Sequence, residues 1–107
     1  MKKLGFSEET EFLETVMRVR VYATLRPIVG GAEPNLDTGP GQTVRELVDE
    51  MVARWPDLRA EMLDGDGNLL RRISIMLNGR NIIYLDRLAT VIPEDAKIDI
   101  FPPVGGG

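Results

Sequence analysis

The first regular pattern in the chain is a strict alternation of apolar and polar side chains over residues 17–25. One face would carry Met17, Val19, Val21, Ala23 and Leu25, and the other Arg18, Arg20, Tyr22 and Thr24. A period of two predicts a half-buried β-strand with one face toward water. Arg26-Pro27 and Gly30-Gly31 end it. A second strand is predicted over residues 32–38, and Pro34 makes it a short or edge strand.

A different period governs residues 43–55, which are predicted to form the main helix. Apolar side chains recur there every three or four positions, at Val44, Leu47, Val48, Met51, Val52 and Trp55. Thr43 and Glu46 have the spacing of a capping box, and Pro56 stops the helix after Trp55. A short helix over residues 57–63 would bury Leu58 and Met62.

Alternation returns in the last third of the chain. Ile73, Ile75 and Leu77 predict a strand, and Asn78-Gly79 is a strong hairpin signal, with residues 80–84 returning beside it. Residues 85–93 are expected to be a connection that packs Leu88 and Val91. The last strand, residues 96–101, should turn Ile98 and Ile100 inward.

These elements predict an α+β domain in which one main helix and one short helix cover one face of a mixed sheet. If the alternation holds, the other face carries Tyr22, Met76 and Phe101. Apolar groups on an open sheet face near the end of the chain would form a docking surface. The equally weighted alternative is that loops or the N-terminal residues cover them.

Residues 1–16 form a polar, acid-rich extension before the domain at residues 17–107. Glutamates surround its few apolar side chains, and Ser7 has the chemistry to cap a short helix. We expect an accessory helix or a frayed arm. The alternative is that Met17, directly before the first strand, is the true start.

Composition narrows the classes of function. The chain of 107 residues has no cysteine and no histidine, which removes thiolate metal sites, a thiol nucleophile and the usual proton shuttle. We therefore expect a protein that is not an enzyme and binds no cofactor. No metal site is expected. The residues from Asp64 begin like a calcium-binding loop, but Leu69 stands where such a loop needs glycine and Ile75 where it needs glutamate.

Charge and hydropathy argue against two kinds of partner. The net charge of −4 is unfavourable for nucleic-acid binding, and no stretch resembles a membrane span or a signal peptide. The expected compartment is the cytoplasm.

The last seven residues, 101–107, combine opposite backbone properties. Pro102 and Pro103 stiffen the chain as it leaves the last strand, whereas three glycines at the tip let a partner close around the main chain. The sequence as printed ends on the carboxylate of Gly107. A terminal carboxyl has a pKa of about 3.3–3.7, so it is ionised at neutral pH and must be activated before it reacts.

The first strand, the helix over residues 43–55, the Asn78-Gly79 hairpin and the Phe101-Pro102-Pro103-Val104 exit together resemble the MoaD/ThiS family of ubiquitin-like sulfur carriers. Within the family, the likeness is to the molybdopterin synthase small subunit and to archaeal small modifier proteins. It covers about residues 17–107. Gly105 stands where the family commonly has another small residue.

The resemblance implies a β-grasp fold and a functional C-terminal Gly106-Gly107. An E1-like adenylyltransferase would adenylate Gly107 with MgATP, and a sulfurtransferase or other sulfide source would convert the adenylate to a thiocarboxylate. Sulfur would then pass to the dithiolene of molybdopterin inside a complex with the large synthase subunit. Phe101, Pro102, Pro103, Val104, Gly105 and Gly106 would bind these partners.

Three readings stay open at this point. The first is a sulfur carrier, for which the resemblance alone favours molybdenum cofactor biosynthesis, while tRNA, a thiazole or an amino-acid precursor are the other destinations for the sulfur. The second is a protein modifier joined through Gly107 to lysines of target proteins by an isopeptide bond. The third is an interaction domain whose tail is inert.

Overall fold

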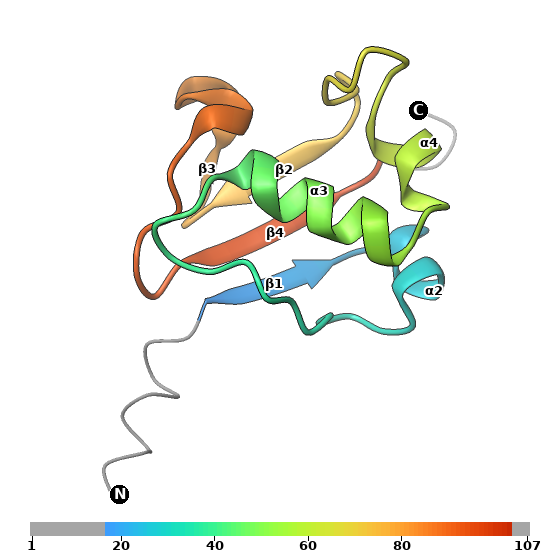
Figure 1. Cartoon of the computed structure of the whole chain (residues 1–107), viewed down its shortest axis with the longest axis horizontal. Helices are drawn as coiled ribbons and strands as arrows, with labels where there is room; N and C mark the ends of the chain where they lie inside the picture. The colour runs from blue at the N-terminus through green and yellow to red at the C-terminus, as the bar shows by residue number, and fades with distance from the viewer. Residues whose placement is uncertain (1–16, 104–107) are drawn as a thin grey trace, which may run out of the picture.

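The structure is a computed structural model that describes residues 17–103. Residues 1–16 and 104–107 lie outside the described part. The described chain forms four strands, three α-helices and two 3₁₀ helices (Figure 1). In chain order these are β1 (Arg18–Val21), α2 (Leu25–Val29), α3 (Val44–Arg54), α4 (Leu58–Met62), β2 (Ser74–Leu77), β3 (Arg80–Asn81), η1 (Ile82–Tyr84), η2 (Arg87–Ala89) and β4 (Lys97–Phe101).

The strands form one mixed sheet in the order β1-β4-β2-β3. β4 lies in its interior, parallel to β1 and antiparallel to β2, and β2 is also antiparallel to β3. Asn78 and Gly79 connect β2 to β3 with positive φ angles of 50° and 86°. This is the hairpin predicted from the Asn-Gly pair, because both central residues of a type I′ turn need positive φ.

Helix α3 crosses one face of the sheet, as the period of its apolar residues predicts (Figure 1). Thr43 Oγ1 accepts a hydrogen bond from the Glu46 amide at 3.2 Å, and Glu46 Oε1 accepts one from the Thr43 amide at 2.8 Å. The expected capping box is therefore present. The helix ends one residue before the predicted Trp55, which is its C-cap.

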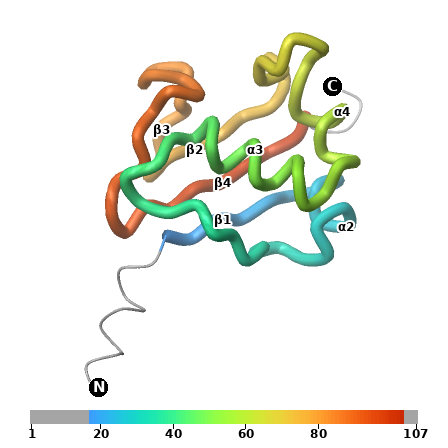
Figure 2. The backbone as a smooth tube through the Cα atoms, in the orientation of Figure 1, coloured from blue at the N-terminus to red at the C-terminus, as the bar shows by residue number. Residues whose placement is uncertain are grey.

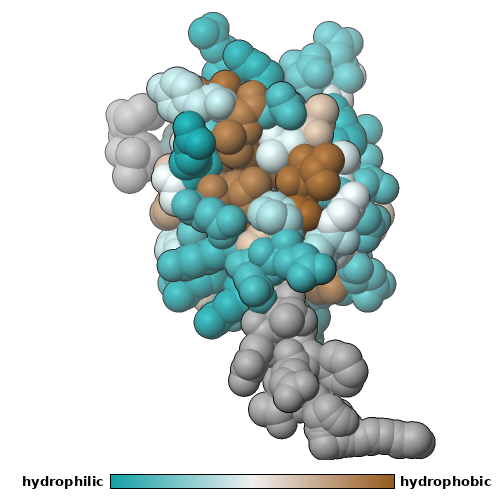
Figure 3. Space-filling view, turned by 90° about the vertical axis from the view of Figure 1, so that its left-hand side faces the viewer, coloured by the Kyte–Doolittle hydropathy of each residue, from teal (hydrophilic) through white to brown (hydrophobic). Residues whose placement is uncertain are grey.

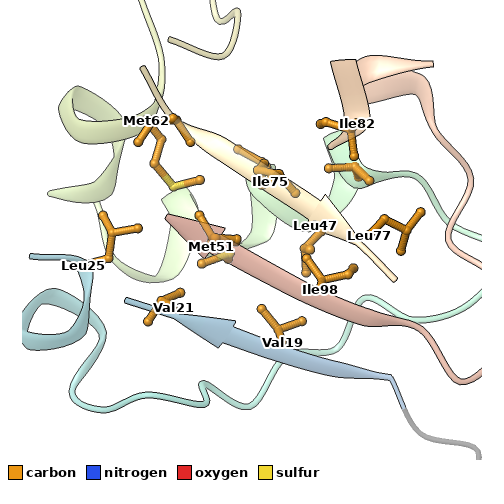
Figure 4. Packing of buried hydrophobic residues seen from close by; sticks show 14 of the residues in the cluster. Val19, Val21, Leu25, Leu47, Met51, Met62, Ile75, Leu77, Ile82 and Ile98 are labelled. Carbon is orange, nitrogen blue, oxygen red and sulfur yellow. The ribbon is translucent and has the colours of Figure 1, made fainter. Parts of the chain in front are cut away.

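The hydrophobic core lies between α3 and the sheet (Figure 4). Leu47 and Met51 of α3 face Val21, Ile75 and Ile98 of the strands, and all of them are buried. The predicted short helix is confirmed as α4, which contributes the buried Leu58 and Met62. Complete burial of one such aliphatic side chain stabilises the fold by about 1.5–3 kcal/mol.

The first strand is shorter than its alternation predicts. β1 ends at Val21, and Ala23 adopts a positive φ of 54°, which turns the chain into helix α2. Leu25 is buried as expected, but from α2 and not from a strand. The prediction of a strand through residue 25 was wrong. The chain reverses at Ala23, but apolar and polar residues go on alternating beyond it, so the sequence pattern does not show where the strand ends.

The strand predicted over residues 32–38 does not form. Figure 2 shows this segment running back past β1, but only one backbone hydrogen bond joins the two, from the Val21 amide to the Ala32 carbonyl at 2.9 Å. The amides of Asp37 and Thr38 donate to the Glu50 carboxylate on α3 at 2.6 and 2.8 Å. A helix side chain thus takes the donors that a strand ladder would need.

The return strand predicted over residues 80–84 is cut to the two residues of β3. Asn81 Oδ1 accepts a hydrogen bond from the Ile83 amide at 3.1 Å and so caps the 3₁₀ helix η1. In the connection that follows, Leu88 is half-buried, whereas Val91, expected to pack, is 58% exposed. No helix in the described part of the chain is long and apolar enough to cross a bilayer.

Candidate functional site

The candidate site is the place where the C-terminal segment leaves the sheet. Phe101 is the last residue of β4, pairs with Ser74 of β2 and is 36% exposed. Pro102 is buried and Pro103 exposed. The other predicted site residues, Val104, Gly105, Gly106 and Gly107, lie outside the described residues.

The ring of Phe101 is held by Tyr22, which follows β1. The two rings stack with centroids 4.3 Å apart and an interplanar angle of 17°. Tyr22 Oη donates a hydrogen bond of 2.8 Å to Asp99 Oδ1, which fixes the second ring. The exit of the tail is therefore set by contacts between the residue that follows β1 and two residues of β4.

The same hydrogen bond affects the ionisation of Tyr22. Only the neutral phenol can donate the hydrogen bond that Asp99 accepts, so this bond raises the pKa of Tyr22. Partial desolvation of the phenol acts in the same direction. The neutral phenol, which anchors the stack, is thus the favoured form.

Two arginines flank this stack. The guanidinium carbons of Arg20 and Arg26 lie 5.8 and 5.2 Å from the centroid of the Tyr22 ring, within cation–π range. Arg26 Nε also donates to the Val21 carbonyl at 3.0 Å. Arg20 Nε lies 4.0 Å from Glu33 Oε2 and makes no hydrogen bond within residues 17–103.

The open face therefore joins aromatic surface to positive charge. Met76 pairs with Asp99 in the register, so Tyr22, Met76 and Phe101 share one face, as predicted. The alternation of apolar and polar residues in the first strand predicted that Arg20 would lie on that face. Arg26 was missed, since it lies beyond the strand and reaches the ring only because the chain reverses at Ala23.

The described part of this site offers aromatic and charged contacts. No cluster of three or more His, Cys, Asp or Glu side chains able to hold a metal ion occurs among residues 17–103. Aromatic and arginine side chains are enriched at protein interfaces, where they often dominate the binding free energy. The arrangement is thus suited to docking a partner beside the tail.

Comparison with known proteins places this geometry in a family. A family model described as the ThiS family matches residues 19–107. The chain is 28% identical over 91 residues to small archaeal modifier protein 3 of Haloferax volcanii, covering 85% of this chain and 98% of that protein. It is 26% identical over 91 residues to the sulfur carrier protein CysO of Mycobacterium tuberculosis, covering 83% and 96%.

A solved structure gives the same result for the fold. The crystal structure of SAMP1 from Haloferax volcanii matches with a TM-score of 0.73 and 26% identity, covering 86% of this chain and 99% of that one. The expected β-grasp, ubiquitin-like fold is confirmed.

Proposed function

The chain belongs to the ThiS family, and from that membership we propose that it carries sulfur as a thiocarboxylate on Gly107. The observation that supports this most is that the family match begins in β1 and extends to Gly107. It spans both the folded domain and the Gly106-Gly107 tip, so the likeness is not confined to the sheet and helix.

The chemistry of the tail follows from its carboxylate. An E1-like enzyme with MgATP joins the Gly107 carboxylate to AMP and releases pyrophosphate, which makes the carbonyl carbon electrophilic. Hydrosulfide from a sulfide source then attacks this carbon and forms the C–S bond, the C–O bond to AMP breaks, and AMP leaves with the electron pair of that bond, so the step needs no oxidant or reductant. The chain supplies the carboxylate, the narrow tip and the docking face, and its partners supply the catalytic groups.

The open face supports the docking role in this scheme. Phe101 is stacked against Tyr22 and cannot swing freely, so the tail starts from a fixed point beside Arg20 and Arg26. A partner that grips this face receives the tip in a constant direction, which lowers the entropic cost of placing Gly107 in an active site.

The experiment is mass spectrometry of the C-terminal peptide after incubation with MgATP, a sulfur donor and the E1-like enzyme of the host. We expect an exchange of one oxygen for sulfur confined to Gly107. Peptide-level data are required because methionine oxidation adds nearly the same mass as this exchange and the chain has five methionines.

Variants of the tip supply the control for that experiment. Removal of Gly105, Gly106 and Gly107 together, or extension of the chain beyond Gly107, should block the exchange and leave the circular dichroism spectrum unchanged. If the exchange persists in either variant, or if the intact chain stays unmodified with an enzyme proven on another carrier, the proposal is wrong.

For the sulfur acceptor we propose the dithiolene of molybdopterin, with the large synthase subunit as the partner. The Phe101-Pro102-Pro103-Val104 exit, which resembles that of synthase small subunits, supports this choice. The thiocarboxylated chain should then convert the pterin precursor when mixed with the large subunit. Transfer to tRNA and none to the pterin would redirect the proposal.

A second function, attachment to other proteins, is favoured by the likeness to small archaeal modifier protein 3. The activated Gly107 carbonyl would then form an isopeptide bond with a lysine amine of a target. Long chains of copies are disfavoured, because Lys2, Lys3 and Lys97 are the only lysines in the sequence. Glycine remnants on target lysines that vanish when Gly105, Gly106 and Gly107 are removed together would identify this reaction.

A further inference from the structure

A second candidate surface lies away from the aromatic stack, on the side of the molecule that carries η1 and η2. It is a groove of about 580 Å³ bordered by the start of α3, residues 68–71, η1 and η2. Figure 3, which faces this side, shows hydrophobic atoms gathered in a patch framed by hydrophilic ones. Neither Tyr22 nor Phe101 lines the groove.

The groove follows from the early end of β3. The ladder between β2 and β3 stops at the pair Met76–Asn81, whereas β2 stays paired with β4 as far as Ser74–Phe101. Among the described strands, the first half of β2 thus has no neighbour on its outer side. After β3 the chain leaves the sheet and forms η1, and the groove lies beside Ile73 and Ile82.

The walls of the groove are apolar and partly exposed. Ile83 is 45% exposed, and Leu69, Leu70 and Leu88 are half-buried around the buried Ile73 and Ile82. Several aliphatic side chains facing water in one hollow are a feature of binding surfaces, unlike the single exposed ones found on every protein.

The charges of the groove differ in sign from those of the whole chain. The chain has 17 acidic and 13 basic residues, but the groove is lined by Arg45, Arg71 and Arg87 and by no acidic residue. Arg45 makes an exposed ion pair with Asp49 at 3.6 Å. Arg71 and Arg87 have no ion pair within residues 17–103.

The η2 rim is held in place before anything binds. Thr90 Oγ1 accepts a hydrogen bond from the Asp86 amide at 3.0 Å and donates one to the Arg87 carbonyl at 2.7 Å. Arg87 keeps a positive φ of 53°, which an arginine adopts only at a cost in backbone strain. A rim that is already ordered loses little entropy on binding.

We propose that this groove binds an acidic segment of a partner protein. Apolar side chains of the segment would fill the hollow beside Ile73 and Ile83, and its carboxylates would meet Arg45, Arg71 and Arg87. The apolar floor favours a peptide over RNA, since phosphates satisfy the arginines but leave the leucines and isoleucines exposed. The proposal does not depend on the chemistry of Gly107.

An unbiased selection tests the choice of occupant. A library of random peptides displayed on phage is selected against the immobilised full chain, with the double variant R71E/R87E as the counter-selection. We expect enriched sequences that combine acidic and apolar residues and bind the double variant roughly tenfold or more weakly. Addition of the best synthetic peptide should shift the methyl resonances of Ile83, Leu69 and Leu88 in the full chain.

The control is Arg59→Glu, which changes charge on the exposed side of α4, outside the groove, and should leave the affinity nearly unchanged. A version of the peptide with lysine in place of each acidic residue should bind R71E/R87E and not the parent chain. Near-native spectra of both variants establish that they fold. No enrichment, selected peptides without acidic residues, shifts at Tyr22 and Phe101 instead, or equal loss in Arg59→Glu would each overturn the proposal.

Discussion

At the scale of single residues, Glu50 of α3 joins the helix to the segment before it. Its carboxylate accepts hydrogen bonds from the amides of Asp37 and Thr38 and from Thr38 Oγ1, the last at 2.6 Å, and pairs with Arg54 at 3.0 Å. Partial burial raises the pKa of Glu50, but the bonds from Thr38 and Asp37 and the charge of Arg54 outweigh it and hold the pKa below its ordinary value.

We expect Glu50→Ala to lower the free energy of unfolding by about 2 kcal/mol, because it removes one acceptor from three donors at once. Chemical denaturation measures this. Asp49→Ala is the matched control on the same helix, since Asp49 is exposed and makes one ion pair with Arg45. It should cost less than about 0.5 kcal/mol. Equal costs for the two variants would contradict the role assigned to Glu50.

The lowered pKa of Glu50 also predicts how stability depends on pH. A carboxyl whose pKa is lower in the folded state stabilises the fold fully above its unfolded pKa of about 4.3, and this contribution is lost as pH falls through the folded value. The parent chain should therefore lose stability in acid more steeply than Glu50→Ala. Parallel curves for the two proteins would mean that Glu50 titrates normally.

Tyr22 predicts the opposite dependence of stability on pH. Its pKa is raised, so its contribution to stability is present below about pH 10 and is lost as pH rises through the folded pKa. Tyr22→Phe keeps the stacked ring but removes the donor to Asp99. Ultraviolet titration of tyrosine absorbance should show the late phenol ionisation in the parent chain and lose it in the variant. Persistence of that ionisation in Tyr22→Phe would assign it elsewhere.

At the scale of elements, the capping box determines where α3 begins. Thr43→Ala removes the acceptor for the Glu46 amide and should cost about 1 kcal/mol of stability. Thr24→Ala is the matched control, because Thr24 occupies the same position before α2 but makes no side-chain cap hydrogen bond. Thermal unfolding of both variants measures the difference. A cost as large for Thr24→Ala would rule out the cap as its source.

The elements predicted correctly from the sequence are those fixed by local periodicity. Helix α3, its cap, the Asn78-Gly79 hairpin and the inward Ile98 and Ile100 all follow from spacing and turn chemistry. Helix α2 was not predictable this way, because Pro27 is a poor helix residue and the apolar Leu25 continues the strand pattern.

Two of the remaining errors share one physical cause, a side chain that accepts hydrogen bonds from backbone amides. Glu50 binds the amides that a strand over residues 32–38 would use, and Asn81 binds the amide of Ile83 and ends β3. Such contacts depend on tertiary proximity or on one local rotamer, and neither alters the period of polarity. The groove beside η1 could not be predicted from the sequence either, because it results from the early end of β3. The residues of the open sheet face were predictable, because they follow the alternation of the strands.

At the scale of the whole molecule, the open face and the tail are predicted to act as one unit. Phe101→Ala removes the ring that stacks on Tyr22, and we expect it to raise the KM of the activating enzyme for this chain with little change in kcat. The stability cost should be about 1 kcal/mol, since the ring lies at the edge of the core. Steady-state kinetics of pyrophosphate release measures both constants.

Tyr84→Ala is the matched control for Phe101→Ala. Tyr84 is an aromatic residue of η1 and is 75% exposed. It should leave KM unchanged. A similar rise in KM for the two variants would mean that the activating enzyme senses general aromatic surface and not the tail exit.

The interior position of β4 has a mechanical consequence. A partner that pulls on the C-terminal segment pulls β4 along its own axis, while the hydrogen bonds to β1 and β2 lie across that axis on both sides. The two ladders then resist together in shear instead of opening one bond at a time. We therefore expect the domain to stay folded while its C-terminal segment is under tension.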